Sequence, residues 1–210
     1  VFRSVLDQKP RMVTAALHDN LYVAYDARQC QLYKAWKGGV IFDGAVYTTN
    51  HGPQPVSKGY AYYQQPEGEI FWTAELNGEE KEIVPKFKGY AIGDGGVTFK
   101  YQLQYDEGSA IHVEETPEYE SKDNKTGFKR TFKVSGVPAA AIIKIKTDLT
   151  NLQAEDDYET NGELKVLSKS TKDLKDGSVH ESKIELILNP DKETSLTVFY
   201  HPGFDVAGEE

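Results

Sequence analysis

The sequence predicts an all-β domain built as a two-sheet antiparallel sandwich, with a supersandwich as the larger variant of that architecture. Three observations predict this fold class. Apolar residues alternate with polar ones over many short segments, turn-forming residues separate these segments, and β-favouring aromatic residues are frequent, with 13 Tyr and 9 Phe among 210 residues. So many strands require two packed sheets, because each strand must bury its apolar face against another layer.

The first predicted strands show why strands are preferred to helices. Ala15, Ala16 and Leu17 would tolerate a helix, which is the alternative for residues 11–36. Tyr22 and Tyr25 favour strands instead, and the intervening His18-Asp19-Asn20 is typical of a tight turn. In chain order, the predicted strands of this half cover residues 11–17, 21–27, 31–36, 39–49, 59–64, 69–76 and 81–92.

The second half carries the clearest strand signal, at residues 96–105. Polar residues alternate there with Val97, Phe99, Tyr101, Leu103 and Tyr105 in strict period two. Turn residues such as those at 106–108 and 189–191 separate this strand and the later ones. The predicted strands of this half cover residues 96–105, 109–119, 126–135, 140–147, 162–170, 179–189 and 194–201.

Composition limits the partners. The chain has 24 Lys and Arg against 33 Asp and Glu, and its formal charge of -9 disfavours nucleic acid as a partner. We expect no membrane span, because the longest apolar run, at residues 137–143, is too short and contains Pro138. The sequence opens at Val1 without an initiator Met, so we expect residues 1–210 to be a single β-sandwich domain and a fragment of a larger multidomain chain.

Four stretches carry a family resemblance: RMVTAALH, LYKAWKGGV, FDGAVYTTNHGPQP and VEETPEY. They resemble a region of large secreted bacterial proteins that carry c-type cytochrome modules. The resemblance implies a periplasmic or secreted, cell-envelope-associated location, with a cytochrome module as a neighbouring partner. It also implies that any haem belongs to that neighbour, and we expect no cofactor in this domain, which contains no CxxCH.

A second likeness is architectural. The succession FKGYAI, GVTFKYQLQY, AIHVEETPEY and FKRTFKVSG is similar to the long antiparallel strands of galactose-mutarotase-like supersandwich domains. Such domains handle sugars both in enzymes and in binding modules. The likeness implies a fold and leaves the function open.

A polar and aromatic segment near the N-terminus is the predicted ligand site. Aromatic faces stack on the C–H groups of sugars, while amides and carboxylates bind pairs of hydroxyls. The alternative is that the aromatic residues of this segment fill the core of the sandwich. The candidate ligand-binding residues are Trp36, Lys37, Asp43, Tyr47, His51 and Gln54.

Two further sites are alternatives. His51 and Glu115 could share proton transfer on a sugar ring, as a mutarotase-like reaction requires. Oxygen-bearing side chains occur at every second position in Asp157, Glu159 and Asn161, as in a calcium-binding loop. The twelfth position of such a loop holds a bidentate Glu, but it is Ser168 here, so we expect no metal.

Three functions therefore remain open. The preferred one is a non-catalytic carbohydrate-binding or assembly module of a secreted, redox-associated protein. The second is a mutarotase-like or other carbohydrate-active enzyme, and the third is a purely structural docking domain of a cytochrome-containing envelope complex.

Overall fold

The computed structural model describes residues 1–42, 53–94, 96–106, 108–175 and 177–202. In these ranges the chain contains strands and turns and no helix, which confirms the all-β prediction. None of these residues forms a helix long and apolar enough to cross a membrane. Every strand pairing is antiparallel, and the strands are grouped in three sheets.

The first sheet is a meander in which each strand pairs with the next along the chain. Asn20, at φ 62°, lies in the turn between its second and third strands, where the sequence predicts a tight turn. Its strands are β1 (Phe2–Leu6), β2 (Lys9–His18), β3 (Leu21–Asp26), β4 (Gln31–Ile41) and β5 (Val56–Gln64).

The second sheet has six strands in the order β13-β16-β11-β10-β9-β8. Its centre is a pair of long hairpins, and β16 joins it from the C-terminal end of the described chain. Its strands are β8 (Val84–Gly93), β9 (Gly96–Asp106), β10 (Ser109–Lys122), β11 (Lys125–Ser135), β13 (Tyr158–Thr160) and β16 (Thr194–Tyr200).

The third sheet has five strands in the order β14-β15-β12-β6-β7. Its edge strand β14 is exposed along almost its whole length and carries several lysines, which is typical of an edge protected against pairing with another chain. Its strands are β6 (Trp72–Leu76), β7 (Glu79–Glu82), β12 (Ile142–Leu152), β14 (Glu163–Leu174) and β15 (Gly177–Leu188).

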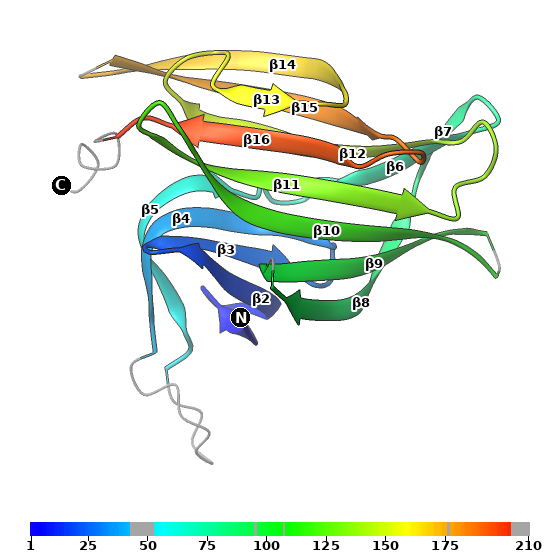
Figure 1. Ribbon diagram of the computed structural model, residues 1–210, viewed down its shortest axis with the longest axis horizontal. Coiled ribbons are helices and arrows are strands. Elements are labelled where there is room, and N and C mark those ends of the chain that lie inside the picture. Colours follow the sequence, from blue (N-terminus) through cyan, green and yellow to red (C-terminus); the bar gives the residue numbers. More distant parts are fainter. Residues whose placement is uncertain (43–52, 95, 107, 176, 203–210) are drawn as a thin grey trace.

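The three sheets form two layers. Figure 1 shows the six-stranded sheet in front, with the two five-stranded sheets side by side behind it. The two rear sheets meet where β12 lies beside β5: Thr150 Oγ1 donates to the carbonyl of Tyr62 at 2.6 Å, and Asn151 Nδ2 donates to that of Ala61 at 3.1 Å. The chain is therefore a β-sandwich whose rear layer is divided into two sheets.

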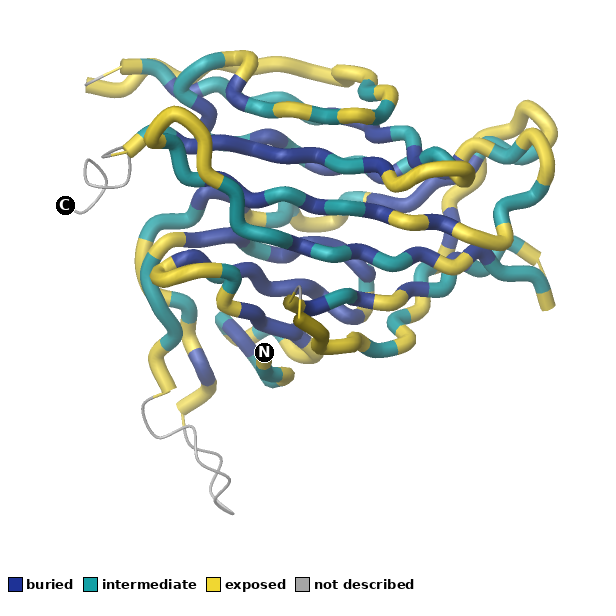
Figure 2. Tube along the Cα trace, in the orientation of Figure 1, coloured by how far each residue is buried: buried dark blue, intermediate teal, exposed yellow. Residues whose placement is uncertain are grey.

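The main core lies between the layers, and Figure 2 shows buried residues along strands of all three sheets. In β9 the side chains of Val97, Phe99, Tyr101 and Leu103 are buried, as the alternation of that segment predicts. Rings from different sheets meet in this core: Tyr62 of β5 stacks on Tyr200 of β16, with their centroids 4.2 Å apart. Aromatic packing therefore joins the two layers.

The predicted strands agree with the structure in most places and fail in four. The prediction missed β1 and β13, whose short segments lack a period-two pattern. The single strand predicted at 81–92 was wrong, because this segment contains the end of β7 and nearly all of β8, which belong to different sheets. The division into separate strands at 31–36 and 39–49 was also wrong, because β4 is continuous from Gln31 to Ile41; residues 43–49 lie outside the described ranges.

Candidate functional site

The structure describes three of the six predicted ligand-binding residues, which are Trp36, Lys37 and Gln54. Asp43, Tyr47 and His51 lie outside the described residues. Lys37, on β4, and Gln54, just before β5, are exposed. Trp36 is 0% exposed, so its ring cannot stack on a ligand in this conformation.

Trp36 belongs to a second apolar cluster on the side of the first sheet that faces away from the main core. Its ring stacks on Tyr22 with the centroids 5.5 Å apart, and its Nε1 donates to the carbonyl of Gly39 at 2.9 Å. The Trp36→Ala substitution would therefore leave a large cavity. If this variant lost binding, the loss would not show that Trp36 contacts a ligand.

Glu115, the predicted proton-transfer carboxylate, lies in the main core and is 0% exposed. Its Oε1 accepts hydrogen bonds from Arg130 Nε at 2.6 Å and from Tyr25 Oη at 2.7 Å. Its Oε2 accepts one from Tyr101 Oη at 3.1 Å. The carboxylate is thus enclosed by three donors, and a sugar could reach it only if the core opened.

The buried charge pair is part of a network that joins all three sheets. Arg130, on β11, donates through Nη2 to Gln31 Oε1 at 2.7 Å and through Nη1 to Thr147 Oγ1 at 3.4 Å. Gln31 Nε2 in turn donates to the carbonyl of Lys146 at 3.0 Å. Burial, followed by the charge of Glu115, raises the pKa of Tyr25 well above its usual value, so this phenol remains a donor. The network satisfies its buried polar groups and functions as a structural unit.

The acidic loop considered for calcium has other partners. Asp157 forms an ion pair with Lys125, and its Oδ2 lies 2.7 Å from His201 Nε2. It also accepts a hydrogen bond from the Ala154 N–H at 3.1 Å. Burial raises the pKa of Asp157, but the hydrogen bonds and charges of Lys125 and His201 outweigh it and lower the pKa below its usual value.

The other two oxygen donors of this loop are also engaged. Glu159 pairs with Lys122, while Asn161 Oδ1 accepts from the Ser195 N–H at 2.8 Å. Within the described ranges, no three His, Cys, Asp or Glu side chains are grouped so as to hold a metal ion.

Asp148, on β12, provides a pH-dependent prediction. Burial, and then the nearby charge of Glu69, raise its pKa to about 6. This folded-state pKa exceeds the unfolded one, so the stabilisation from Asp148 is present below about pH 4 and is lost as the pH rises through about 6. Because the carboxyl is only partly buried, we expect Asp148→Asn to raise the free energy of unfolding at pH 8 by about 1 kcal/mol.

Urea unfolding at about pH 3.5 and pH 8 checks this prediction, with Asp191→Asn as the exposed control. The Asp148→Asn variant should differ little from the wild type at the lower pH. An equal gain at both pH values would contradict the role of the raised pKa.

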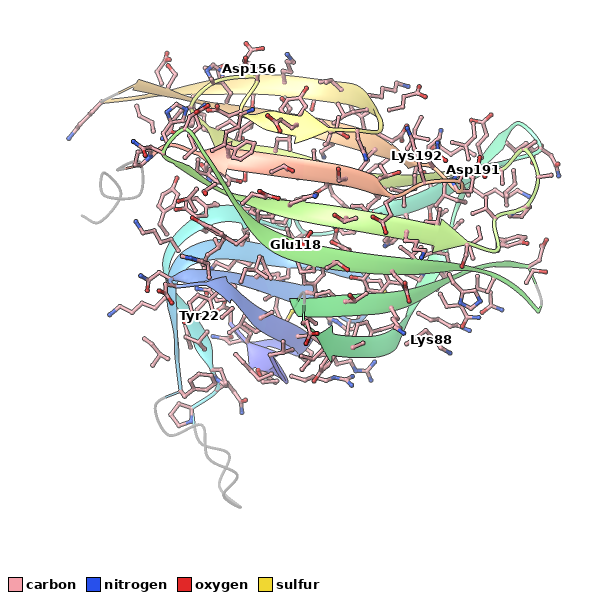
Figure 3. All side chains as sticks on the ribbon, in the orientation of Figure 1. Tyr22, Lys88, Glu118, Asp156, Asp191 and Lys192 are labelled. Atoms are coloured by element: carbon pink, nitrogen blue, oxygen red, sulfur yellow. The ribbon has the colours of Figure 1, made fainter. Side chains whose placement is uncertain are left out.

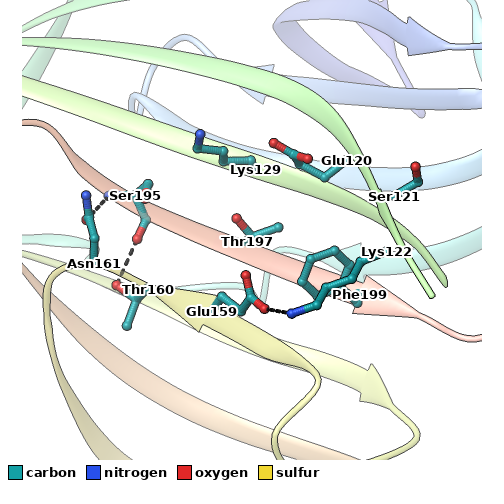
Figure 4. A pocket seen from close by; sticks show the side chains of 10 residues that line it. All are labelled: Glu120, Ser121, Lys122, Lys129, Glu159, Thr160, Asn161, Ser195, Thr197 and Phe199. Carbon is teal, nitrogen blue, oxygen red and sulfur yellow. Dashed lines mark hydrogen bonds and ion pairs between the residues drawn. The ribbon is translucent and has the colours of Figure 1, made fainter.

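A polar pocket lies on the outer face of the six-stranded sheet, and Figure 4 shows the side chains around it. It has a volume of about 390 Å³ and adjoins a second hollow of about 280 Å³, with which it shares Lys129, Asn161 and Ser195. Glu120 and Thr197 add a carboxylate and a hydroxyl. Glu118, labelled on β10 in Figure 3, lines the second hollow. The two hollows form an elongated polar surface.

An aromatic ring interrupts this polar surface at Phe199. The ring lies opposite Gly127 in the pairing of β16 with β11, and a Cβ atom at Gly127 would lie 2.8 Å from the ring. Lys122 Nζ is 6.0 Å from the centroid of the ring and covers it. The absence of a side chain at Gly127 therefore allows Phe199 to lie across the neighbouring strand.

The sequence analysis missed this pocket, although a signal was present. In β16 the residues on the outer face are Ser195, Thr197 and Phe199, and an aromatic residue is unusual on a face that is otherwise polar. Its other residues come from β10, β11 and β13, which only the folded sheet brings together.

No protein-family model matches this chain, and no curated protein matches it either.

Proposed function

We propose that this domain is a non-catalytic carbohydrate-binding or assembly module of a secreted or periplasmic protein of the cell envelope, with the polar pocket as its sugar site. The observation that carries the proposal is the elongated polar surface lined by Glu120, Lys129, Asn161, Ser195 and Thr197. Hydroxyl, amide and charged groups in one open groove match the alternating donors and acceptors of a glycan.

The enclosure of Glu115 favours a binding module over an enzyme. A general base must lie within hydrogen-bond reach of its substrate, whereas this carboxylate is held inside the core by Arg130, Tyr25 and Tyr101. Binding at the polar pocket needs no such group, because a ligand can reach the partly exposed Glu120 and Lys129 without any opening of the core.

A glycan array tests the proposal with wild-type protein and the Glu120→Ala/Lys129→Ala variant. We expect wild-type protein to bind at least one glycan and the variant to bind it about tenfold more weakly, because it loses one carboxylate and one ammonium group. The matched control is Lys172→Ala/Glu181→Ala, which removes an ion pair between β14 and β15 outside the pocket. No binding to any glycan would overturn the sugar proposal, and equal weakening in both variants would place the site elsewhere.

A docking domain is the second candidate, and one observation favours it. The edge strand β8 exposes apolar side chains, with Val84 and Ile92 each 68% exposed. Exposed apolar groups on an unpaired sheet edge are typical of a contact surface. If this edge contacts a neighbouring module, the amides of β8 should exchange hydrogen more slowly in the parent chain than in the separate domain.

A further inference from the structure

A second pocket of this acidic chain is lined by positive charge. It has a volume of about 430 Å³, and its wall contains Arg3, Arg11, Arg28, Lys86 and Lys88 together with the ring of Phe87. No Asp or Glu of the described ranges lines it. We call it the basic pocket. Such a concentration of cations stands out in a chain with a formal charge of -9.

The fold builds the basic pocket from two sheets. Arg3 lies on β1 and Arg11 on β2 of the first sheet, while Lys86 and Lys88 lie on β8, the edge of the six-stranded sheet. Figure 3 labels Lys88 on this edge strand. The register of β8 shifts between Phe87 and Gly89, and such a bulge redirects neighbouring side chains. The pocket therefore depends on the packing of the sandwich.

Hydrogen bonds fix the side chain of Arg28 and the backbone of Arg11. Arg28 donates through Nε and Nη2 to the two carboxylate oxygens of Asp26, at 3.1 and 2.8 Å. Arg11 has φ 62°, a left-handed conformation that is uncommon for a residue other than glycine, and its carbonyl accepts from the Ala27 N–H at 3.0 Å. A costly backbone conformation inside a strand is typical of residues placed for a function.

The remaining cations of the basic pocket lack carboxylate partners. Most of the salt bridges among the described residues join a lysine to a nearby Asp or Glu, as between Lys144 and Glu80. In contrast, Arg3, Arg11, Lys86 and Lys88 have no ion pair within the part of the chain that the structure describes. Asp26 offsets only the charge of Arg28. The mutual repulsion of these cations would be relieved by a bound anion.

We propose that the basic pocket binds a tetrahedral oxyanion, sulfate or phosphate, either free or as an ester on a larger molecule. Guanidinium groups present paired N–H donors that match two oxygens of such a group, and the lysines add point charges around it. Phe87 provides an apolar wall, with the guanidinium carbon of Arg3 5.9 Å from its ring centroid. This site is separate from the polar pocket and does not depend on it.

An NMR titration at low ionic strength tests the proposal with inorganic sulfate, inorganic phosphate, glucose 6-sulfate and glucose 6-phosphate. Low ionic strength is needed because salt screens these charges. The amide signals around Arg3 and Lys88 should shift and saturate with at least one probe. Tighter binding of an ester than of its inorganic ion would show that the ligand is a sulfate or phosphate ester on a larger molecule. Equal binding would show that the ligand is the free ion. Both outcomes support the proposal.

Two variants with equal charge change separate the pocket from general electrostatics. Arg3→Glu/Lys88→Glu should weaken binding by about tenfold or more, because it replaces two attractive charges with two repulsive ones. Lys165→Glu/Lys175→Glu lowers the net charge equally, but its exposed lysines lie on β14 and just after it, away from the pocket. If Arg3→Glu/Lys88→Glu does not fold, Arg3→Gln/Lys88→Gln is used in its place. The proposal is overturned if the wild type shows no saturable binding of any probe, or if the control weakens binding as much as the pocket variant.

Discussion

Arg130→Met should lower the free energy of unfolding by about 3–5 kcal/mol, one of the two largest effects expected for this protein. The substitution removes the cation that Glu115 needs in a core without access to water. It also removes one of the two hydrogen bonds that Gln31 Oε1 accepts and leaves only the one from the Leu32 N–H. An uncompensated buried charge costs far more than the attraction that a surface pair contributes.

A second substitution identifies the cause of this loss. In Glu115→Gln/Arg130→Met the carboxylate charge is also removed, while the amide oxygen of Gln can still accept from Tyr25 or Tyr101. We expect the double variant to be about 2 kcal/mol more stable than Arg130→Met alone. Urea unfolding of both variants gives this difference, and a double variant less stable than the single one would rule out the unpaired charge as its cause.

Gly59→Ala should cost about 3 kcal/mol or more, since two independent effects add. Gly59 has φ 118°, which L residues rarely adopt, and a Cβ there would lie 2.0 Å from the carbonyl oxygen of Lys37. Gly38, on β4, is paired with Gly59 and has a similar conformation, so neither strand has room for a side chain at this pair.

The consequences should reach beyond this pair of strands. Because Tyr62 of β5 accepts the hydrogen bond from Thr150, displacement of β5 also weakens the junction of the two rear sheets. The matched control is Gly39→Ala, since a Cβ at Gly39 meets nothing within 4 Å. Urea unfolding should place the control within about 1 kcal/mol of the wild type. Equal effects of both substitutions would contradict the role of the close approach.

Local patterns in the sequence predicted most of the strands, for a physical reason that β9 illustrates. Its buried Val97, Phe99 and Tyr101 alternate with outward-facing residues, and this pattern depends only on the geometry of a single strand. The prediction of one strand at 81–92 was wrong because Ile83 lies between two strands that pair with different partners. Which partner a strand chooses depends on contacts with residues distant in the chain.

The candidate sites could be predicted far less well than the strands. Trp36 and Glu115 are residue types that also bind sugars and transfer protons, but the same types fill cores and form buried pairs. Whether such a residue binds a ligand or fills the core depends on which face of its strand packs against another layer. Phe199 was visible as an aromatic residue on a polar face, yet its partner Gly127 lies on another strand.

The sequence by itself determined that this protein is an all-β sandwich, because period-two alternation and turn residues act over a few neighbouring residues. Only the tertiary structure decided the division of the rear layer into two sheets, the enclosure of Glu115 by Arg130, and the assembly of the polar and basic pockets. Arg3 and Lys88 are 85 positions apart in the sequence (88 minus 3) and line one pocket only because β8 packs near the first sheet. Such proximity arises from the packing of layers, which alternation along a single strand does not encode.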